Sequence, residues 1–299
     1  MTYHDPVLLK ESIEGLNIQP KGVYIDLTFG GGGHSREVLN KLGRKGRLFA
    51  FDQDPDAANN IPDDNRFTFI RANFRFLKHF LRYYGIAQAD GMLADLGISS
   101  HQIDVPDRGF SYRFDGKLDM RMNRESAFDA AQIVNRYAPE ELTRIFREYG
   151  ELSNAGQLAT TIIKEREQSP VVTVSDLERV LGRFIPAKNP YSFLAKVYQA
   201  LRIEVNQEMQ ALGEMLLQTT ALIRPGGRLV VITYHSLEDR MVKNFLRSGN
   251  LEGKIGKDFF GNPLTPWTLI NRNVITPGTE EIERNNRARS AKLRIAEKN

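Results

Sequence analysis

The chain has 299 residues, with 41 lysines and arginines against 37 aspartates and glutamates, and it contains no cysteine. This length predicts about two domains, and the missing cysteine excludes disulfides, thiolate zinc sites and any reaction that needs a cysteine nucleophile. No run approaches the ~18 apolar residues of a membrane span, and the first residues lack the pattern of a signal peptide. We therefore expect a cytoplasmic protein with no membrane partner.

The net charge of +4 is distributed unevenly along the chain. Residues 284–299 carry six basic side chains and one acidic side chain, so the basic surplus is concentrated in this last segment. A second stretch, 179–202, holds five basic residues and no acidic one. Both stretches could contact a polyanion, or could simply be solvated surfaces.

The first hundred residues alternate short apolar runs with amphipathic segments. The runs that predict strands are 23–29, 47–51, 66–70 and 91–96. Between the third and fourth runs, apolar residues in 74–84 recur every three or four positions, which is typical of a helix. Alternating strands and helices predict βαβ units and a largely parallel sheet.

This alternation stops after Asp95. From about 127 to 222 the pattern indicates helices only, and strand character returns at 225–234. A βα crossover needs about a dozen residues, whereas more than a hundred separate Asp95 from Arg228. An additional helical domain is therefore predicted between the fourth and fifth strands.

We place this inserted substrate domain at 104–206 and assign 1–103 together with 207–299 to the other domain. In the basic last segment, residues 290–295 alternate polar and apolar side chains. That period of two predicts a closing strand and not a disordered basic tail.

A run of four glycines, 30–33, follows the first predicted strand. Glycines let the backbone approach a ligand closely, and the helix start beyond them offers free N–H groups to an anion. Asp52 ends the second strand, 22 residues after Gly30, a placement that suits hydrogen bonds to ribose hydroxyls. These features favour an adenosine-containing cofactor at the carboxyl ends of the strands.

Two cofactors match this pattern to different degrees. A dinucleotide site uses G-x-G-x-x-G, but the third glycine would fall at Ser35 or Arg36. S-adenosylmethionine needs only a seat for a carboxylate, an acid for the ribose and a slot for adenine. The turn at 225–227, Pro-Gly-Gly, is also typical of class I methyltransferases. The residues therefore favour S-adenosylmethionine over a nicotinamide cofactor, and the alternative for the loop alone is a plain tight turn.

Several blocks in chain order resemble the bacterial small-subunit ribosomal RNA methyltransferase H family. They are 4–9, 24–35, 95–100, 108–111, 118–122, 199–206, 225–229, 235–240 and 287–294. The resemblance implies an α/β class I S-adenosylmethionine-dependent methyltransferase fold, Rossmann-like, with a mostly parallel sheet, an antiparallel last strand and an inserted all-helical domain. It further implies methylation of the exocyclic N4 of one cytidine in the decoding region of 16S rRNA, within the small ribosomal subunit. The oligomeric state stays open.

The resemblance also implies which residues hold the cofactor. Gly32, Gly33 and His34 would contact its methionine end, Asp52 its ribose, and Phe74, Asp95 and Gln102 the remainder. Asp95 is also the candidate catalytic residue, because a carboxylate can accept hydrogen bonds from a cytosine amino group. His34 could instead be a general base, although we favour a hydrogen-bonding role.

Substrate RNA contacts are predicted at Lys188, Lys196, Arg202 and His235. The simpler interpretation of His235 is a place beside a helix start, with Ser236 as the cap. At two positions, Asn123 and Lys196, this chain departs from the residue that is usual in the family, which leaves details of RNA contact open. The chain shows no recognisable metal cluster. An alternative function is that of an RNA-binding ribosome assembly factor that uses the methyltransferase fold as a scaffold.

Overall fold

The computed structural model describes residues 6–299 and divides the chain into two compact units. One comprises the residues up to Gly97 together with Met209–Asn299, and the other comprises Ile98–Glu208. The predicted insert, 104–206, lies within the second unit. That unit starts earlier than predicted because Ile98 already packs against its hydrophobic core.

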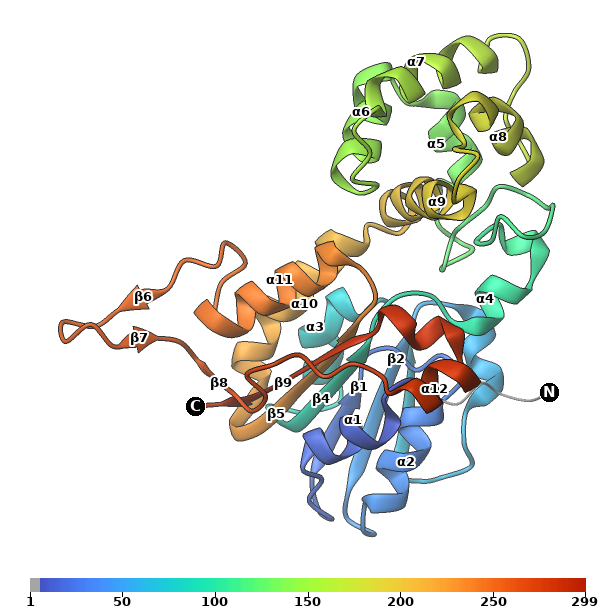
Figure 1. Cartoon of the computed structure of the whole chain (residues 1–299). Coiled ribbons are helices and arrows are strands. Elements are labelled where there is room, and N and C mark those ends of the chain that lie inside the picture. The colour runs from blue at the N-terminus through green and yellow to red at the C-terminus, as the bar shows by residue number, and fades with distance from the viewer. Residues whose placement is uncertain (1–5) are drawn as a thin grey trace. The chain divides into compact units, whose positions relative to one another are not determined.

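A seven-stranded sheet forms the centre of the first unit (Figure 1), in the order β3-β2-β1-β4-β5-β9-β8. The strands are β1 Val23–Asp26, β2 Arg47–Asp52, β3 Phe67–Arg71, β4 Ala89–Asp95, β5 Ile223–Thr233, β8 Trp267–Leu269 and β9 Lys292–Lys298. Strands β1 to β5 pair in parallel, whereas β9 is antiparallel to both β5 and β8. This is the strand arrangement of a class I methyltransferase, so the predicted mostly parallel sheet with an antiparallel last strand is confirmed.

Helices cover both faces of this sheet, which is why its strands are nearly all apolar. The helices of the first unit are α1 Leu9–Leu16, α2 Gly33–Lys41, α3 Leu77–Tyr83, α10 Glu208–Leu222, α11 Ser236–Ser248 and α12 Thr279–Arg284. Alternate residues of β2 point to opposite faces of the sheet. Leu48 packs in the cluster with α1 and α2, whereas Phe49 and Phe51 pack in the cluster with α3, α10 and α11.

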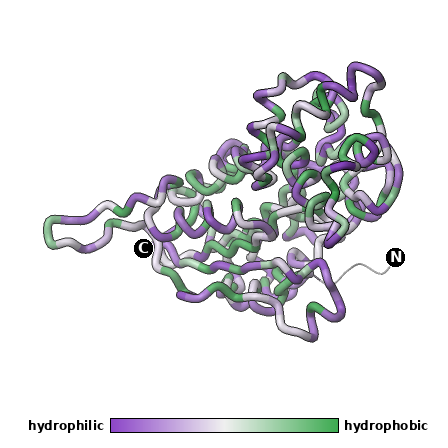
Figure 2. Tube along the Cα trace, turned by 45° about the horizontal axis from the view of Figure 1, so that its top comes forward, coloured by the Kyte–Doolittle hydropathy of each residue, from purple (hydrophilic) through white to green (hydrophobic). Residues whose placement is uncertain are grey.

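A thin arm leaves the edge of the sheet between α11 and β8. It contains the short strands β6, Gly256–Lys257, and β7, Pro263–Leu264, which pair with each other. The arm projects from the sheet (Figures 1 and 2). Phe259 and Phe260, which lie between its two strands, are 96% and 85% exposed. The predicted closing strand is confirmed as β9, which begins at Lys292 because 286–290 form a 3-10 turn.

The second unit is helical and has its own core. Its helices are α4 Ser100–Asp104, α5 Ala130–Arg136, α6 Pro139–Glu148, α7 Ala155–Arg166, α8 Val174–Leu181 and α9 Pro190–Asn206. The apolar residues of α6 follow helical spacing, and Leu142, Ile145 and Phe146 are fully buried. Across residues 6–299, no helix combines the length and the apolar character that crossing a membrane requires.

Polar side chains fix the long loop that enters this unit. The buried guanidinium of Arg108 donates hydrogen bonds to the carbonyl oxygens of Arg121 and Met122, at 3.0 and 3.3 Å. The amide of Asn206, at the end of α9, accepts from the Met122 N–H and donates to the Met120 carbonyl, both at 2.8 Å. These bonds tie the loop to α9 without regular secondary structure.

Candidate active site

Three aspartates end neighbouring strands at one edge of the sheet. Asp26 ends β1, Asp52 ends β2 and Asp95 ends β4. The parallel pairing of β1 with both of the other strands brings these carboxyl ends together. Ligands of open α/β sheets bind at this edge, so the three carboxylates mark the candidate site in the first unit.

The glycine loop between β1 and α2 lies at the same edge. Gly30 and Gly32 have φ values of +50° and +74°, which side chains rarely tolerate. A Cβ on Gly32 would lie 2.9 Å from the Phe29 ring, and one on Gly33 would lie 2.2 Å from Pro6. Among the described residues, no side chain caps α2. Its first N–H groups are therefore available to a ligand carboxylate.

Asp52 is bonded directly to this loop. Its Oδ2 accepts a hydrogen bond from the Gly30 N–H and its Oδ1 accepts one from the Asp54 N–H, each at 2.8 Å. Burial raises the pKa of Asp52 to about 6, although both hydrogen bonds oppose the shift. A carboxylate oxygen can accept more than one hydrogen bond. Asp52 can therefore still receive the hydroxyl groups of a ribose.

Asp95 is held from two sides. Its Oδ1 accepts a hydrogen bond from the Tyr234 hydroxyl, and its backbone N–H donates to Thr28 Oγ1, both at 2.7 Å. Within 6–299, Oδ2 receives no hydrogen bond, and His34 Nδ1 lies 3.8 Å from it. Burial raises the pKa of Asp95 to about 7. Burial and the adjacent carboxylate also raise the pKa of Tyr234 well above its ordinary value, so its hydroxyl remains a donor.

The geometry around His34 defines its protonation. Its Nε2 lies 3.1 Å from the carbonyl oxygen of Val7, which can only accept, so Nε2 carries the proton. Burial lowers the pKa of His34, which keeps the ring neutral and leaves a lone pair on Nδ1. Nδ1 and Asp95 Oδ2 are thus two acceptors that face each other. A donor placed between them would satisfy both.

Sequence reasoning missed two residues of this edge. Asp26 is buried and accepts hydrogen bonds from the Ser35 hydroxyl at 2.6 Å and from the Thr28 N–H at 3.1 Å. Burial raises the pKa of Asp26. Tyr234 lies beyond the end of β5 and reaches Asp95 because β4 and β5 are neighbours. For Asp26 the signal was present, since an acid in an apolar strand just before a glycine loop is unusual.

The remaining predicted cofactor residues fall in different units. Phe74 begins a 3-10 turn after β3, and the preceding Asn73 donates a hydrogen bond to Gln53, next to Asp52, at 2.9 Å. This bond ties Phe74 to the candidate edge. Gln102 belongs to the second unit, where it forms a capping box with Ser99 at the start of α4. Its contact with a cofactor stays a prediction.

The predicted RNA residues differ in what they contact. Lys188 and Lys196 are exposed in the second unit, and Lys196 projects from α9. Arg202 donates to both carboxylate oxygens of Glu208, at 2.9 and 3.0 Å, and its side chain is 13% exposed. His235, and not Ser236, caps α11, because its Nδ1 accepts from the Glu238 N–H at 3.4 Å.

These residues fit S-adenosylmethionine. The uncapped start of α2 suits the carboxylate of its methionine end, and Asp52 suits its ribose. The paired acceptors Asp95 Oδ2 and His34 Nδ1 suit an ammonium or amino donor. For a Cβ on Gly30, the nearest atom outside the two adjacent residues would be the Thr28 carbonyl oxygen at 4.0 Å, so space remains beside the loop.

Known proteins resemble this chain along nearly its whole length. The model of the MraW methylase family matches residues 1–299. A Parabacteroides distasonis protein named ribosomal RNA small subunit methyltransferase H is 59% identical over 297 residues, covering 99% of this chain and 97% of the relative. A protein of the same name from Phocaeicola vulgatus is 58% identical over 296 residues, with 99% and 97% covered. Among solved structures, a putative rRNA methylase from Clostridium thermocellum aligns with a TM-score of 0.46 and 12% identity, covering 98% of both chains.

Proposed function

The chain belongs to the MraW methylase family, and on this premise we propose that it methylates the exocyclic N4 of one cytidine in 16S rRNA. S-adenosylmethionine is its methyl donor. The observation that carries the reaction is Asp95 at the end of β4, a carboxylate with one oxygen that receives no hydrogen bond within 6–299. The names of the close relatives support ribosomal RNA of the small subunit as the substrate.

S-adenosylmethionine supplies a methyl group activated by its sulfonium sulfur. Most of the catalysis in such a displacement is positioning and electrostatics. Asp52, fixed by the Gly30 N–H, would hold the ribose, and the start of α2 would hold the methionine carboxylate. Neither group needs to gain or lose a proton during transfer, so both act by orientation.

The cytosine amino nitrogen is a poor nucleophile because its lone pair is delocalised into the ring. A carboxylate that accepts a hydrogen bond from the amino group would favour a tetrahedral nitrogen and so free the lone pair. Asp95 can do this when ionised, and the Tyr234 hydroxyl holds its other oxygen in place. Methylation at cytosine C5 requires a cysteine adduct, and the chain contains no cysteine. N4 therefore fits this chain better than C5.

The target base must leave its stack to reach the methyl group. Lys188 and Lys196, exposed on the helical unit, are the candidates to hold the surrounding phosphates. Arg202 is engaged by Glu208, so we assign it a structural role instead. We also propose a cytoplasmic location, because ribosomal RNA is made and assembled there.

Cells that lack this gene and then regain it provide the test. Mass mapping of 16S rRNA should show one N4-methylcytidine that disappears with the gene and returns with the wild-type copy. A copy carrying Asp95→Asn should not restore the modification. If Asp95→Asn restored growth or subunit assembly while the base stayed unmodified, a scaffolding role would explain the phenotype. An N4-methylcytidine level independent of the gene would contradict the proposal.

A further inference from the structure

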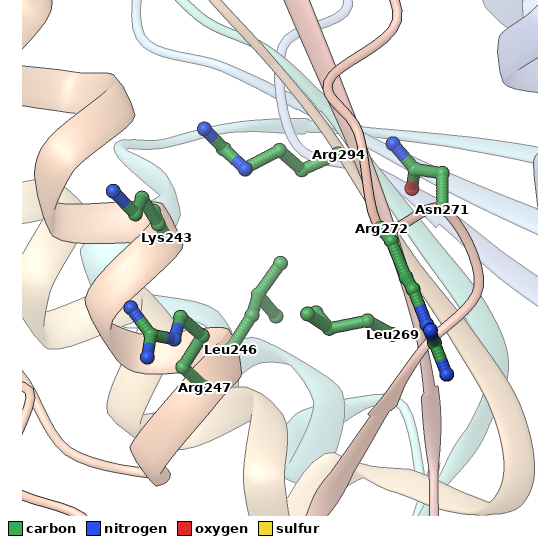
Figure 3. A pocket seen from close by; sticks show the side chains of 7 residues that line it. All are labelled: Lys243, Leu246, Arg247, Leu269, Asn271, Arg272 and Arg294. Carbon is green, nitrogen blue, oxygen red and sulfur yellow. The ribbon is translucent and has the colours of Figure 1, made fainter.

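A cationic pocket opens on the first unit (Figure 3), and none of the three aspartates lines it. Its volume is about 260 Å³. It is lined by Lys243, Leu246 and Arg247 of α11, Leu269 of β8, Asn271 and Arg272 of the following loop, and Arg294 of β9. Four of these seven side chains are cationic and none is acidic. We call this site the α11–β9 pocket.

Three of its four charges are uncompensated. Lys243, Arg247 and Arg272 are exposed, and none of them pairs with a carboxylate in the described part of the chain. Lys243 and Arg247 are four residues apart on α11 and therefore lie on one face, where like charges repel each other. Arg294 extends from β9 toward α11, and its Nε donates to Asp239 at 2.7 Å. The pocket thus keeps a net positive charge that only an external anion can neutralise.

The walls of the pocket are rigid. Asn271 is fully engaged, because its side chain accepts from the Ile295 N–H at 2.8 Å and donates to the Leu293 carbonyl at 3.3 Å. These bonds clamp the Arg272 loop to β9. Between the cations lie Leu246, which is fully buried, and Leu269 (Figure 3). An apolar floor with a cationic rim suits a sugar–phosphate unit, since the guanidinium groups match phosphate oxygens.

Basic residues of β9 and α11 extend from the candidate active edge to the pocket, with Asp239 between them, paired with Lys292 at 3.4 Å and with Arg294 at 2.7 Å. Lys292 pairs with Thr233, the last residue of β5, and Arg294 follows on the same face of β9. Along α11, Lys243 and Arg247 come seven and eleven residues after Ser236, which is roughly 10 to 17 Å down a helix. A single strand of nucleic acid that leaves the edge would reach the pocket within a few nucleotides.

We propose that the α11–β9 pocket binds a backbone phosphate of the RNA strand that flanks the target nucleotide. This inference rests on the proposed function and adds an anchoring site on the sheet unit to the candidates on the helical unit. Phosphate contacts of this kind set register and affinity but do not read sequence.

The test is a triple variant, Lys243→Gln, Arg247→Gln and Arg272→Gln, assayed on small ribosomal subunits. All three side chains are exposed, so the fold should not change. We expect KM for the subunit to rise about tenfold at moderate salt, with a salt slope smaller by about 1 for each phosphate that the variant no longer neutralises. The matched control is Lys41→Gln, Arg44→Gln and Lys45→Gln, which removes the same charge from exposed positions elsewhere. It should behave as the wild type.

Photo-crosslinking identifies the occupant. With p-benzoylphenylalanine in place of Leu269, crosslinks should form to rRNA nucleotides beside the methylated base. Crosslinks to a ribosomal protein only, or a triple variant that matches the control in KM and salt slope, would overturn the inference. Both results require a wild-type enzyme that methylates the subunit. If the wild type itself transferred no methyl group to rRNA, the proposed function would have failed instead.

Discussion

Replacing Asp95 with asparagine should stabilise the ligand-free protein above neutral pH. The carboxylate is half-buried at the sheet edge, where loss of solvent raises its pKa from 3.8 to about 7. A raised pKa means that ionisation is more costly in the folded state than in the unfolded chain. The cost is absent below the unfolded pKa, grows as pH rises, and is complete above pH 7. Asparagine mimics the protonated acid and avoids it.

The size of the effect follows from the shift. About three pKa units at about 1.4 kcal/mol each give an upper value of about 4 kcal/mol. The Asp95 side chain is 23% exposed, so solvent screens part of this and we expect about 2 to 4 kcal/mol at pH 8. At pH 5 less than half of that difference should remain. The Tyr234 hydroxyl can still donate to the asparagine oxygen, so the local packing should be preserved.

Urea unfolding of the ligand-free wild type and Asp95→Asn at pH 5 and pH 8 measures this. The stability advantage of the variant should be about 2 kcal/mol larger at pH 8 than at pH 5. Asp63→Asn, at an exposed position of the same unit, is the charge control and should show no such growth. An advantage for Asp95→Asn that is equal at both pH values would refute the link between burial and ionisation. Methyl transfer by the variant should fall despite its greater stability.

Three further outcomes follow from the geometry. Affinity for S-adenosylmethionine should rise from pH 5.5 to pH 7.5, and binding should release protons, because Asp52 and Asp95, with pKa values of about 6 and about 7, must both ionise before they accept hydrogen bonds from the ligand. Calorimetry in two buffers of different ionisation enthalpy detects the released protons. An affinity that does not change with pH would contradict this prediction. Gly32→Ala should lower the free energy of unfolding by about 1 to 2 kcal/mol and weaken the binding of S-adenosylmethionine, since the φ of Gly32 is +74°. The control is Gly156→Ala in α7, where a Cβ would meet no atom within 4 Å, and it should leave the melting temperature unchanged or raise it. Arg202→Gln should lower the melting temperature because it removes the two hydrogen bonds, at 2.9 and 3.0 Å, that the guanidinium donates to Glu208. Lys196→Gln should change only RNA binding, and the reverse result would favour Arg202 as an RNA contact.

The sheet was predictable because its signals are local. Each strand of the parallel core is a short apolar run, and helices on both faces impose that composition. The long separation between Asp95 and Arg228 also required an inserted domain, whatever its detailed packing. The closing strand was predictable from the alternation of polar and apolar residues in 290–295, although a 3-10 turn before it means that β9 begins only at Lys292.

The site was predictable only where a residue belongs to a continuous block. Asp52 could be placed because a strand and a glycine loop frame it. The Tyr234 hydroxyl donates a hydrogen bond to Asp95, which lies 139 residues earlier in the chain, and no pattern in either segment predicts that contact. The α11–β9 pocket likewise combines side chains from a helix, a strand, a loop and the closing strand. The ion pair of Arg202 was also hidden from sequence reasoning, since its partner Glu208 lies beyond the end of α9, where Gln207 adopts a positive φ.

The most direct test of the central claim is transfer of an isotopically labelled methyl group by the purified protein. Small ribosomal subunits from cells that lack the gene are incubated with S-adenosylmethionine carrying a deuterated methyl group, and the 16S rRNA is digested and analysed by mass spectrometry. The account predicts label on N4 of a single cytidine with the wild type and a large loss of label with Asp95→Asn. Label on C5, on a ribose hydroxyl or on a base other than cytosine would contradict it.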